Sequence, residues 1–125
     1  MEVLFREDDG INETECLIMY DGDVKLYMLV LKTFLKEIRK TKEAMQLTFD
    51  SEDIENYRIL VHGLKGSGGS AGATALVDLA TKSNDLIKNG RWEESKRFHQ
   101  PLIDELTRLI DLIPERLRKK GENLV

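Results

Sequence analysis

The residues best suited to do chemistry lie in a glycine-rich stretch around one histidine. Residues 57–73 run YRILVHGLKGSGGSAGA, so Lys65 follows His62 at three positions and Gly66 follows it at four. Imidazole, with an ordinary pKa of about 6.5, is largely neutral at physiological pH and is then a competent nucleophile. Phosphoryl transfer needs an open line of attack and positive charge near the phosphoryl oxygens. His62 and Lys65 therefore suggest a phosphoryl acceptor and its cation.

The stretch predicts a helix with one apolar face and one open face. At roughly 100° per residue, the open face holds Glu55, Arg58, Ile59, His62, Lys65, Gly66 and Gly69. Each glycine inside a helix costs about 1 kcal/mol relative to alanine, so a purely structural helix has little reason to carry several. We interpret Gly66 and Gly69 as positions where a partner approaches the backbone closely, and Arg58 and Ile59 as its further contacts. Gly68 and Gly72 are better explained by packing and by the turn.

The elements that position this stretch are predicted to be helices throughout. Apolar residues recur at helical spacing over most of the chain, with only two prolines and 6% aromatics. We expect four main helices over about residues 23–48, 51–70, 74–89 and 92–118, with Pro101 bending or restarting the last. A short helix capped by Asn12 and ending near Tyr20 precedes them. Because the connections are short, the predicted fold is an all-α, up-and-down antiparallel four-helix bundle with an extra N-terminal helix.

Composition bounds the class of protein. The chain has 125 residues, 19 Lys and Arg against 23 Asp and Glu, and a net charge of −4. This predicts a single domain over residues 1–125 with a core over about residues 12–118. The mild acidity argues against nucleic acid or a membrane as partner, and we expect a monomer. One cysteine and no long apolar stretch predict a reducing, cytoplasmic location without signal peptide or membrane span.

Several conspicuous residues are predicted to be structural. Neither His99 nor Cys16 belongs to a constellation of reactive residues. The methionine and aromatic positions, Trp92 included, lie at helical spacing and are expected in the core. No set of His, Cys, Asp and Glu suggests a metal site, and the glycine-rich stretch has no carboxylate cluster for Mg²⁺. The donor's metal and activated phosphoryl group are therefore expected on a partner.

The motif closely resembles the signature of histidine-containing phosphotransfer (HPt) domains of two-component phosphorelays. The resemblance is carried by His62, Leu64, Lys65, Gly66 and Ser67, followed by Gly72, Ala73 and Leu76. It extends to Gly22 and Asp23, Phe34, Trp92 and Phe98. Ala71 stands where the family often has a larger aliphatic residue, and Asn84 near a position that often holds an acid.

This resemblance implies a mechanism and partners. His62 would take a phosphoryl group from a receiver-domain aspartyl phosphate and pass it to another receiver aspartate, and Lys65 would steady it. The glycines would open the docking surface. The partners would be receiver domains of a hybrid sensor kinase or of a response regulator, with Mg²⁺ bound on the receiver. The domain itself would have no cofactor and no kinase activity.

Two other functions are weighed against this one. Gly66, Gly68 and Ala71 after an apolar run imitate a dinucleotide-binding turn, but no second strand ends in an acid about 20 residues on. A nucleotide-binding enzyme is thus disfavoured. A helical-bundle interaction domain that binds its partner without phosphorylation differs in sequence only by the presence of His62, so that alternative stays open.

Overall fold

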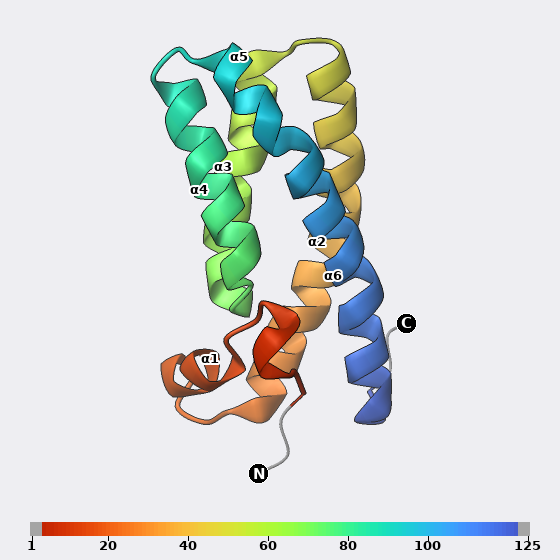
Figure 1. Cartoon of the computed structure of the whole chain (residues 1–125). Coiled ribbons are helices and arrows are strands. Elements are labelled where there is room, and N and C mark those ends of the chain that lie inside the picture. Colours follow the sequence, from red (N-terminus) through yellow and green to blue (C-terminus); the bar gives the residue numbers. More distant parts are fainter. Residues whose placement is uncertain (1–3, 123–125) are drawn as a thin grey trace.

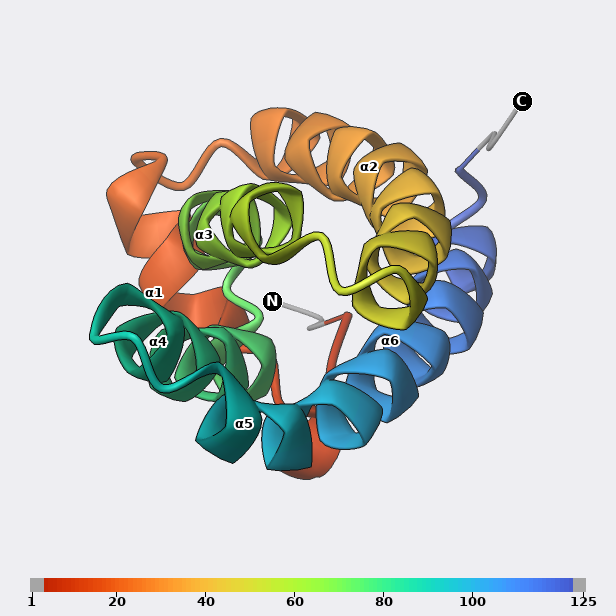
Figure 2. The same cartoon turned by 90° about the horizontal axis from the view of Figure 1, so that it is seen from above.

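Helices are the only regular secondary structure in residues 4–122, the part of the chain that the computed structural model describes. Four long helices form an antiparallel up-and-down bundle (Figure 1): α2 (Val24–Asp50), α3 (Ile54–Ala71), α4 (Thr74–Lys88) and α6 (His99–Lys119). Seen along its axis, the bundle encloses one core, with α3 between α2 and α4 (Figure 2). Within the described residues, no helix is long and apolar enough to cross a membrane. The predicted all-α bundle is confirmed.

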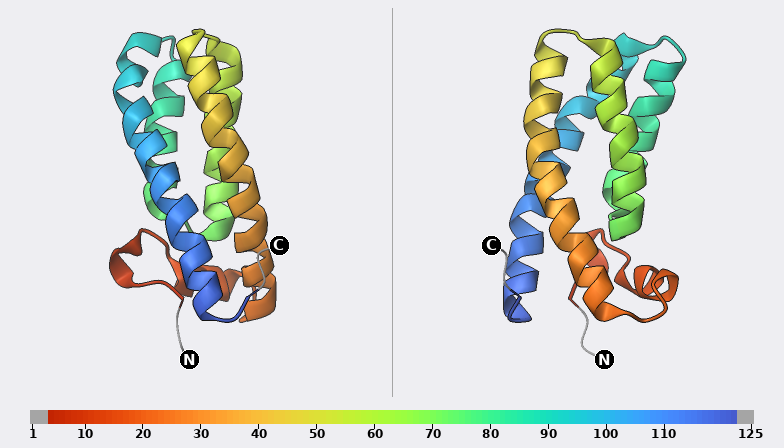
Figure 3. Two further views of the ribbon diagram at one scale, coloured as in Figure 1. Left: turned by 90° about the vertical axis from the view of Figure 1, so that its right-hand side faces the viewer. Right: turned by 180° about the vertical axis from the view of Figure 1, so that it is seen from behind.

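Three short elements complete the chain. α1 (Glu13–Met19) lies beneath the lower end of α3, and η1 (Glu7–Asp9) is a single 3-10 turn before it (Figure 3). α5 (Trp92–Ser95) and η2 (Lys96–Phe98) connect α4 to α6 across the upper end of the bundle. The extra N-terminal helix is confirmed, and its N-cap is Asn12, whose side chain accepts from the Glu15 amide at 3.1 Å.

The core consists of the apolar stripes that the sequence predicts. Each long helix turns one stripe inward, as amphipathic helices of a bundle do. The largest fully buried side chains are Tyr27, Leu31, Ile38, Met45, Tyr57, Leu64, Leu76, Leu102, Leu106, Leu109, Ile113 and Leu117. The open face of α3 is thereby left to solvent.

One predicted helix boundary is wrong and one predicted break is found. α3 begins at Ile54 rather than at residue 51, because the Ser51 hydroxyl bonds back to the Leu47 carbonyl at 2.9 Å and so extends the end of α2. The chain then turns through Glu52 (φ 52°), and Asp53 is the N-cap of α3. The predicted restart of the last helix near Pro101 is confirmed, since the segment over residues 92–118 is divided into α5, η2 and α6, which begins two residues before that proline. Pro101 lies in the first turn of α6, where its missing amide hydrogen leaves no intrahelical bond unmade.

The upper end of the bundle is held by a buried histidine. His99 is 4% exposed and its ring stacks on Phe49 with centroids 3.7 Å apart. Its Nδ1 lies 2.9 Å from the Tyr57 hydroxyl, and its Nε2 lies 3.2 Å from the Gln46 side-chain oxygen. Burial lowers the pKa of His99. Its predicted structural place is thus confirmed.

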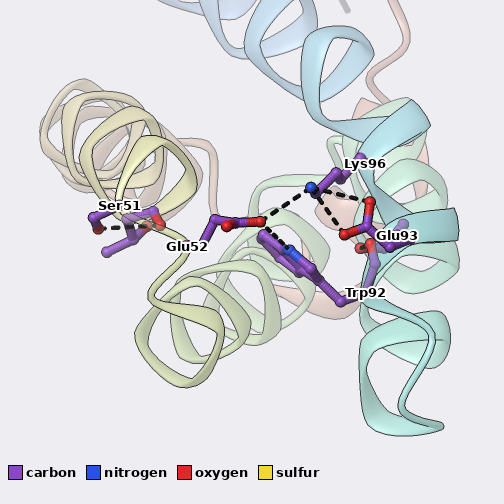
Figure 4. Close-up of polar contacts among 7 residues, drawn as sticks. Ser51, Glu52, Trp92, Glu93 and Lys96 are labelled. Atoms are coloured by element: carbon purple, nitrogen blue, oxygen red, sulfur yellow. Dashed lines mark hydrogen bonds and ion pairs between the residues drawn. The ribbon is translucent and has the colours of Figure 1, made fainter.

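A polar cluster closes the same end from outside (Figure 4). The Trp92 indole donates to the Glu52 carboxylate at 3.4 Å, and the Lys96 ammonium donates to Glu52 and to Glu93, each at 3.1 Å. These bonds lower the pKa of the Glu52 carboxyl and connect the α2–α3 turn to α5 and η2. Trp92 itself is buried, as predicted.

The lower end is closed by the segment before α1. Leu4, Phe5 and Ile11 are buried members of the core, which therefore starts earlier than the predicted residue 12. The buried Glu13 carboxylate fixes this segment by accepting from the Leu4 amide at 2.8 Å and the Phe5 amide at 2.9 Å. Sequence patterning missed these contacts because the segment has no helical period.

Candidate functional site

His62 lies in the middle of α3 with its imidazole exposed to solvent, as predicted. Within the described chain it has neither a hydrogen bond nor an ion pair, and the same holds for the half-buried Lys65. Helical side chains lean toward the N-terminus of their helix, so the Lys65 side chain leans toward the turn that carries His62. The site therefore presents an unengaged imidazole with one unengaged cation a turn away.

The glycines of α3 divide into two groups by the space around them. A Cβ built on Gly63, Gly66 or Gly69 would meet no atom within 4 Å. A Cβ on Gly68 would lie 2.9 Å from the Val77 side chain. Packing within the described residues therefore does not require glycine beside His62, whereas it does require Gly68 where α3 packs on α4. Gly63 belongs to the open group, which the sequence reasoning did not recognise.

Gly72 ends α3 and contacts the start of α1, where its carbonyl accepts from the Asn12 amide at 2.7 Å. Its φ of +79° is the left-handed conformation that favours glycine at a helix C-cap. A Cβ there would lie 2.7 Å from the Cys16 sulfur and 2.9 Å from the Asn12 carbonyl oxygen. The predicted roles of Gly68 and Gly72 in packing and turning are confirmed.

Arg58 and Ile59 lie one turn before His62 on the same face of α3. The Arg58 guanidinium donates to the Glu55 carboxylate at 3.1 Å and is partly exposed. Ile59 is 52% exposed although it is apolar. The structure thus brings all six predicted site residues onto one exposed strip of α3, and adds Glu55 as the partner of Arg58.

A second group of exposed apolar side chains borders this strip, and the sequence analysis did not predict it. Ile18 is 73% exposed and Met19 is 55% exposed, both at the end of α1. Met19 thereby corrects the expectation that methionines lie in the core, because α1 is too short to bury two faces. The only available signal was that this apolar pair falls outside the periodic stripes of the long helices.

No metal-binding constellation accompanies the site. Among residues 4–122, no three His, Cys, Asp or Glu side chains gather closely enough to hold a metal ion. Cys16 is buried, its sulfur lies 3.7 Å from the Ser70 carbonyl oxygen, and burial raises the pKa of its thiol. That environment disfavours the reactive thiolate and agrees with a structural cysteine.

Comparison with known proteins adds a family. The family model of the Hpt domain matches residues 29–113. Among solved structures, the HPT domain of an Hpt sensor hybrid histidine kinase from Shewanella is similar, with a TM-score of 0.82 and 21% sequence identity. The match covers 89% of this chain and 96% of that one. No curated protein sequence matches the chain.

Proposed function

Because this chain belongs to the Hpt domain family, whose members carry phosphoryl groups on histidine in two-component phosphorelays, we propose that His62 is its phosphoacceptor. The observation that supports this choice is the exposed, unengaged imidazole on α3 beside Lys65 and the bare backbone of Gly66. The chain's other histidine, His99, is buried and bonded on both ring nitrogens.

The proposed reaction is an in-line transfer between a carboxylate and an imidazole. A lone pair on one ring nitrogen of neutral His62 attacks the phosphorus of a receiver aspartyl phosphate. The N–P bond forms as the acyl phosphate P–O bond breaks, the aspartate leaves as a carboxylate, and the other ring nitrogen keeps its proton. In the second transfer, another receiver aspartate attacks the same phosphorus and the imidazole leaves neutral.

The cations of α3 serve this reaction electrostatically. Lys65 places positive charge beside the equatorial oxygens, on which negative charge is spread in the transition state. Arg58 contributes to receiver binding, since a second acidic surface can compete with the exposed Glu55 for its guanidinium. The Mg²⁺ that such a transfer requires is held by the receiver, and the domain acts without kinase activity of its own.

Receiver docking uses the open part of α3. Gly66 and Gly69 lack side chains where nothing in the described chain would obstruct one, so a partner backbone or ring can lie directly on the helix. Ile59 adds an exposed apolar contact one turn from His62. We propose that the domain acts as a cytoplasmic monomer between a receiver of a hybrid sensor kinase and a receiver of a response regulator.

The test is label transfer from a receiver carrying radiolabelled aspartyl phosphate. Wild type and His99→Gln are expected to gain acid-labile, alkali-stable label, and His62→Gln is expected to gain none. His99→Gln is the matched control because it removes the only other imidazole. Label retained by His62→Gln would disprove the assignment. Receiver binding without any labelling would favour an interaction domain that works without phosphorylation.

A further inference from the structure

The exposed apolar pair of α1 borders a groove that the phosphotransfer site does not explain. The groove lies between α1 and the lower ends of α3 and α4 and has a volume of about 680 Å³. Figure 3 shows α1 beneath these helix ends. Ile18 and Met19 form one wall, Gly69 and Val77 line it from the bundle, and Glu15 and Asp78 add carboxylates. Two large exposed apolar side chains beside such a groove mark an interaction surface.

The groove is continuous with the site around His62. Gly69 lines the groove and also belongs to the open strip of α3. Gly69 follows His62 by seven positions on the helix, which is about 10 Å along the axis. A standard protein interface covers about 800 Å² on each partner, so one partner that reaches His62 also covers the groove.

The groove side of this surface is acidic. Residues 7–23 contain seven Asp and Glu and neither Lys nor Arg. Asp9 is paired with Arg116 and Glu13 is occupied by backbone amides. Glu15, Asp21 and Asp23 are exposed, although one oxygen of Glu15 accepts from the Asn12 side chain and one of Asp23 from the Leu26 amide. The surface around His62 carries the opposite charge, from Arg58 and Lys65. The two halves therefore differ in sign.

We infer that this groove is a specificity site for the receiver: it takes a partner helix whose apolar ridge is flanked by lysine or arginine. The inference rests on the proposed function. Ile18 and Met19 pack on the ridge, as in helix-in-groove recognition, and the exposed Glu15 carboxylate of α1 attracts the flanking cations. Receivers with acidic residues at those positions are rejected, because like charges brought together on docking cost binding energy.

The apolar half of the inference is tested with the double variant Ile18→Ser/Met19→Ser. Its matched control is Leu47→Ser, which removes an equally exposed apolar side chain near the upper end of α2. The probe is a receiver with Lys or Arg beside its apolar ridge. The double variant is expected to raise the half-saturating receiver concentration about tenfold, and the control to leave it unchanged within about twofold. An unchanged double variant would overturn the inference.

The charge half is tested with Glu15→Lys against the isocharge control Glu43→Lys on α2. Glu15→Lys is expected to slow association with the basic-flanked receiver several-fold at low salt, with the difference shrinking at high salt, and to speed association with an acidic-flanked receiver. Equal effects of the two variants, or no change of preference between the receivers, would overturn it.

Two further measurements separate the inference from the proposed function. Phosphoramidate phosphorylates an exposed histidine without a receiver, so all variants are expected to gain equal label from it. A variant that loses only the receiver-driven labelling is then impaired in receiver docking. If wild type gains no label from receivers, calorimetric binding of the unphosphorylated receiver still tests the groove. Sedimentation that shows a dimer of this chain abolished by Ile18→Ser/Met19→Ser would instead place a second copy in the groove and overturn the inference.

Discussion

At the residue scale, the site is defined by what its side chains do not contact. His62 and Lys65 lack partners within the described residues, and Gly66 and Gly69 face open space. Stability alone favours alanine at both glycines. The chain therefore retains a less stable helix where another molecule is expected to bind.

Replacing Lys65 tests the electrostatic part of the mechanism. Lys65→Ala is expected to slow receiver-driven transfer at saturating receiver by at least about tenfold, because a cation beside the phosphoryl oxygens stabilises the transition state. Lys25→Ala, an exposed lysine at the start of α2, is the control. Identical transfer rates for the two variants, with intact helical circular dichroism, would show that Lys65 is incidental.

Replacing glycines one at a time tests why each is present. Gly66→Ala and Gly69→Ala are expected to raise the free energy of unfolding by up to about 1 kcal/mol. Gly68→Ala is expected to lower it by about 1 kcal/mol, because the stiff Val77 side chain lies 2.9 Å from the new Cβ. Urea denaturation measures both effects. A gain of stability in Gly68→Ala would contradict the packing role.

At the element scale, the helix ends were harder to predict than the helices. Asp50, Ser51 and Asp53 are all good N-cap residues, and the sequence does not distinguish among them. Asp53 caps α3 because Ser51 is already bonded to the preceding helix and Glu52 is held by Lys96 and Trp92. The start of α3 is thus decided by contacts across the upper end of the bundle.

The buried histidine at that end predicts a dependence of stability on pH. Burial lowers the pKa of His99, and the negative charge of Asp50 opposes the shift only in part. The unfolded chain protonates this imidazole near about pH 6.5 and the folded protein only at lower pH. As the pH falls through that window, the unfolded state binds more protons and the free energy of unfolding decreases.

The measurement is urea denaturation of wild type and of His99→Gln at about pH 7.5 and about pH 5.5. Wild type is expected to lose more stability between the two values than the variant, which has no imidazole at this position. Asp50, the charged group that acts on the ring, is present in both proteins, so its own contribution cancels to first order. Equal losses would refute the prediction.

At the scale of the whole molecule, the two ends of the bundle are closed by different means. The upper end is closed by aromatic packing around His99 and the polar bonds of Glu52. The lower end is closed by the N-terminal segment and α1, which lie outside the residues that the family model matches. The groove at the lower end is therefore lined partly by residues outside that match, on α1, and partly by residues inside it, on α3 and α4.

Truncating the buried Phe5 side chain tests how much the N-terminal segment contributes to the stability of the protein. Phe5 is 4% exposed, so Phe5→Ala is expected to lower the free energy of unfolding by about 3 kcal/mol or more. Ile18→Ala, at an exposed position of α1, is expected to change it by less than about 0.5 kcal/mol. Phosphoramidate labelling of the folded Phe5→Ala protein should stay normal, because His62 lies on α3. An unchanged urea midpoint in Phe5→Ala would contradict the packing.

The sequence by itself determined the bundle, the place of His62 on an open helix face and the predicted site residues of α3. These follow from helical periodicity and from motif spacing within one helix, which are local properties. Tertiary structure alone decided the cap of α3, the burial of Leu4 and Phe5, and the exposure of Ile18 and Met19. Each of these features depends on contacts between residues far apart in the sequence. The local sequence of a short segment without helical periodicity does not predict such contacts.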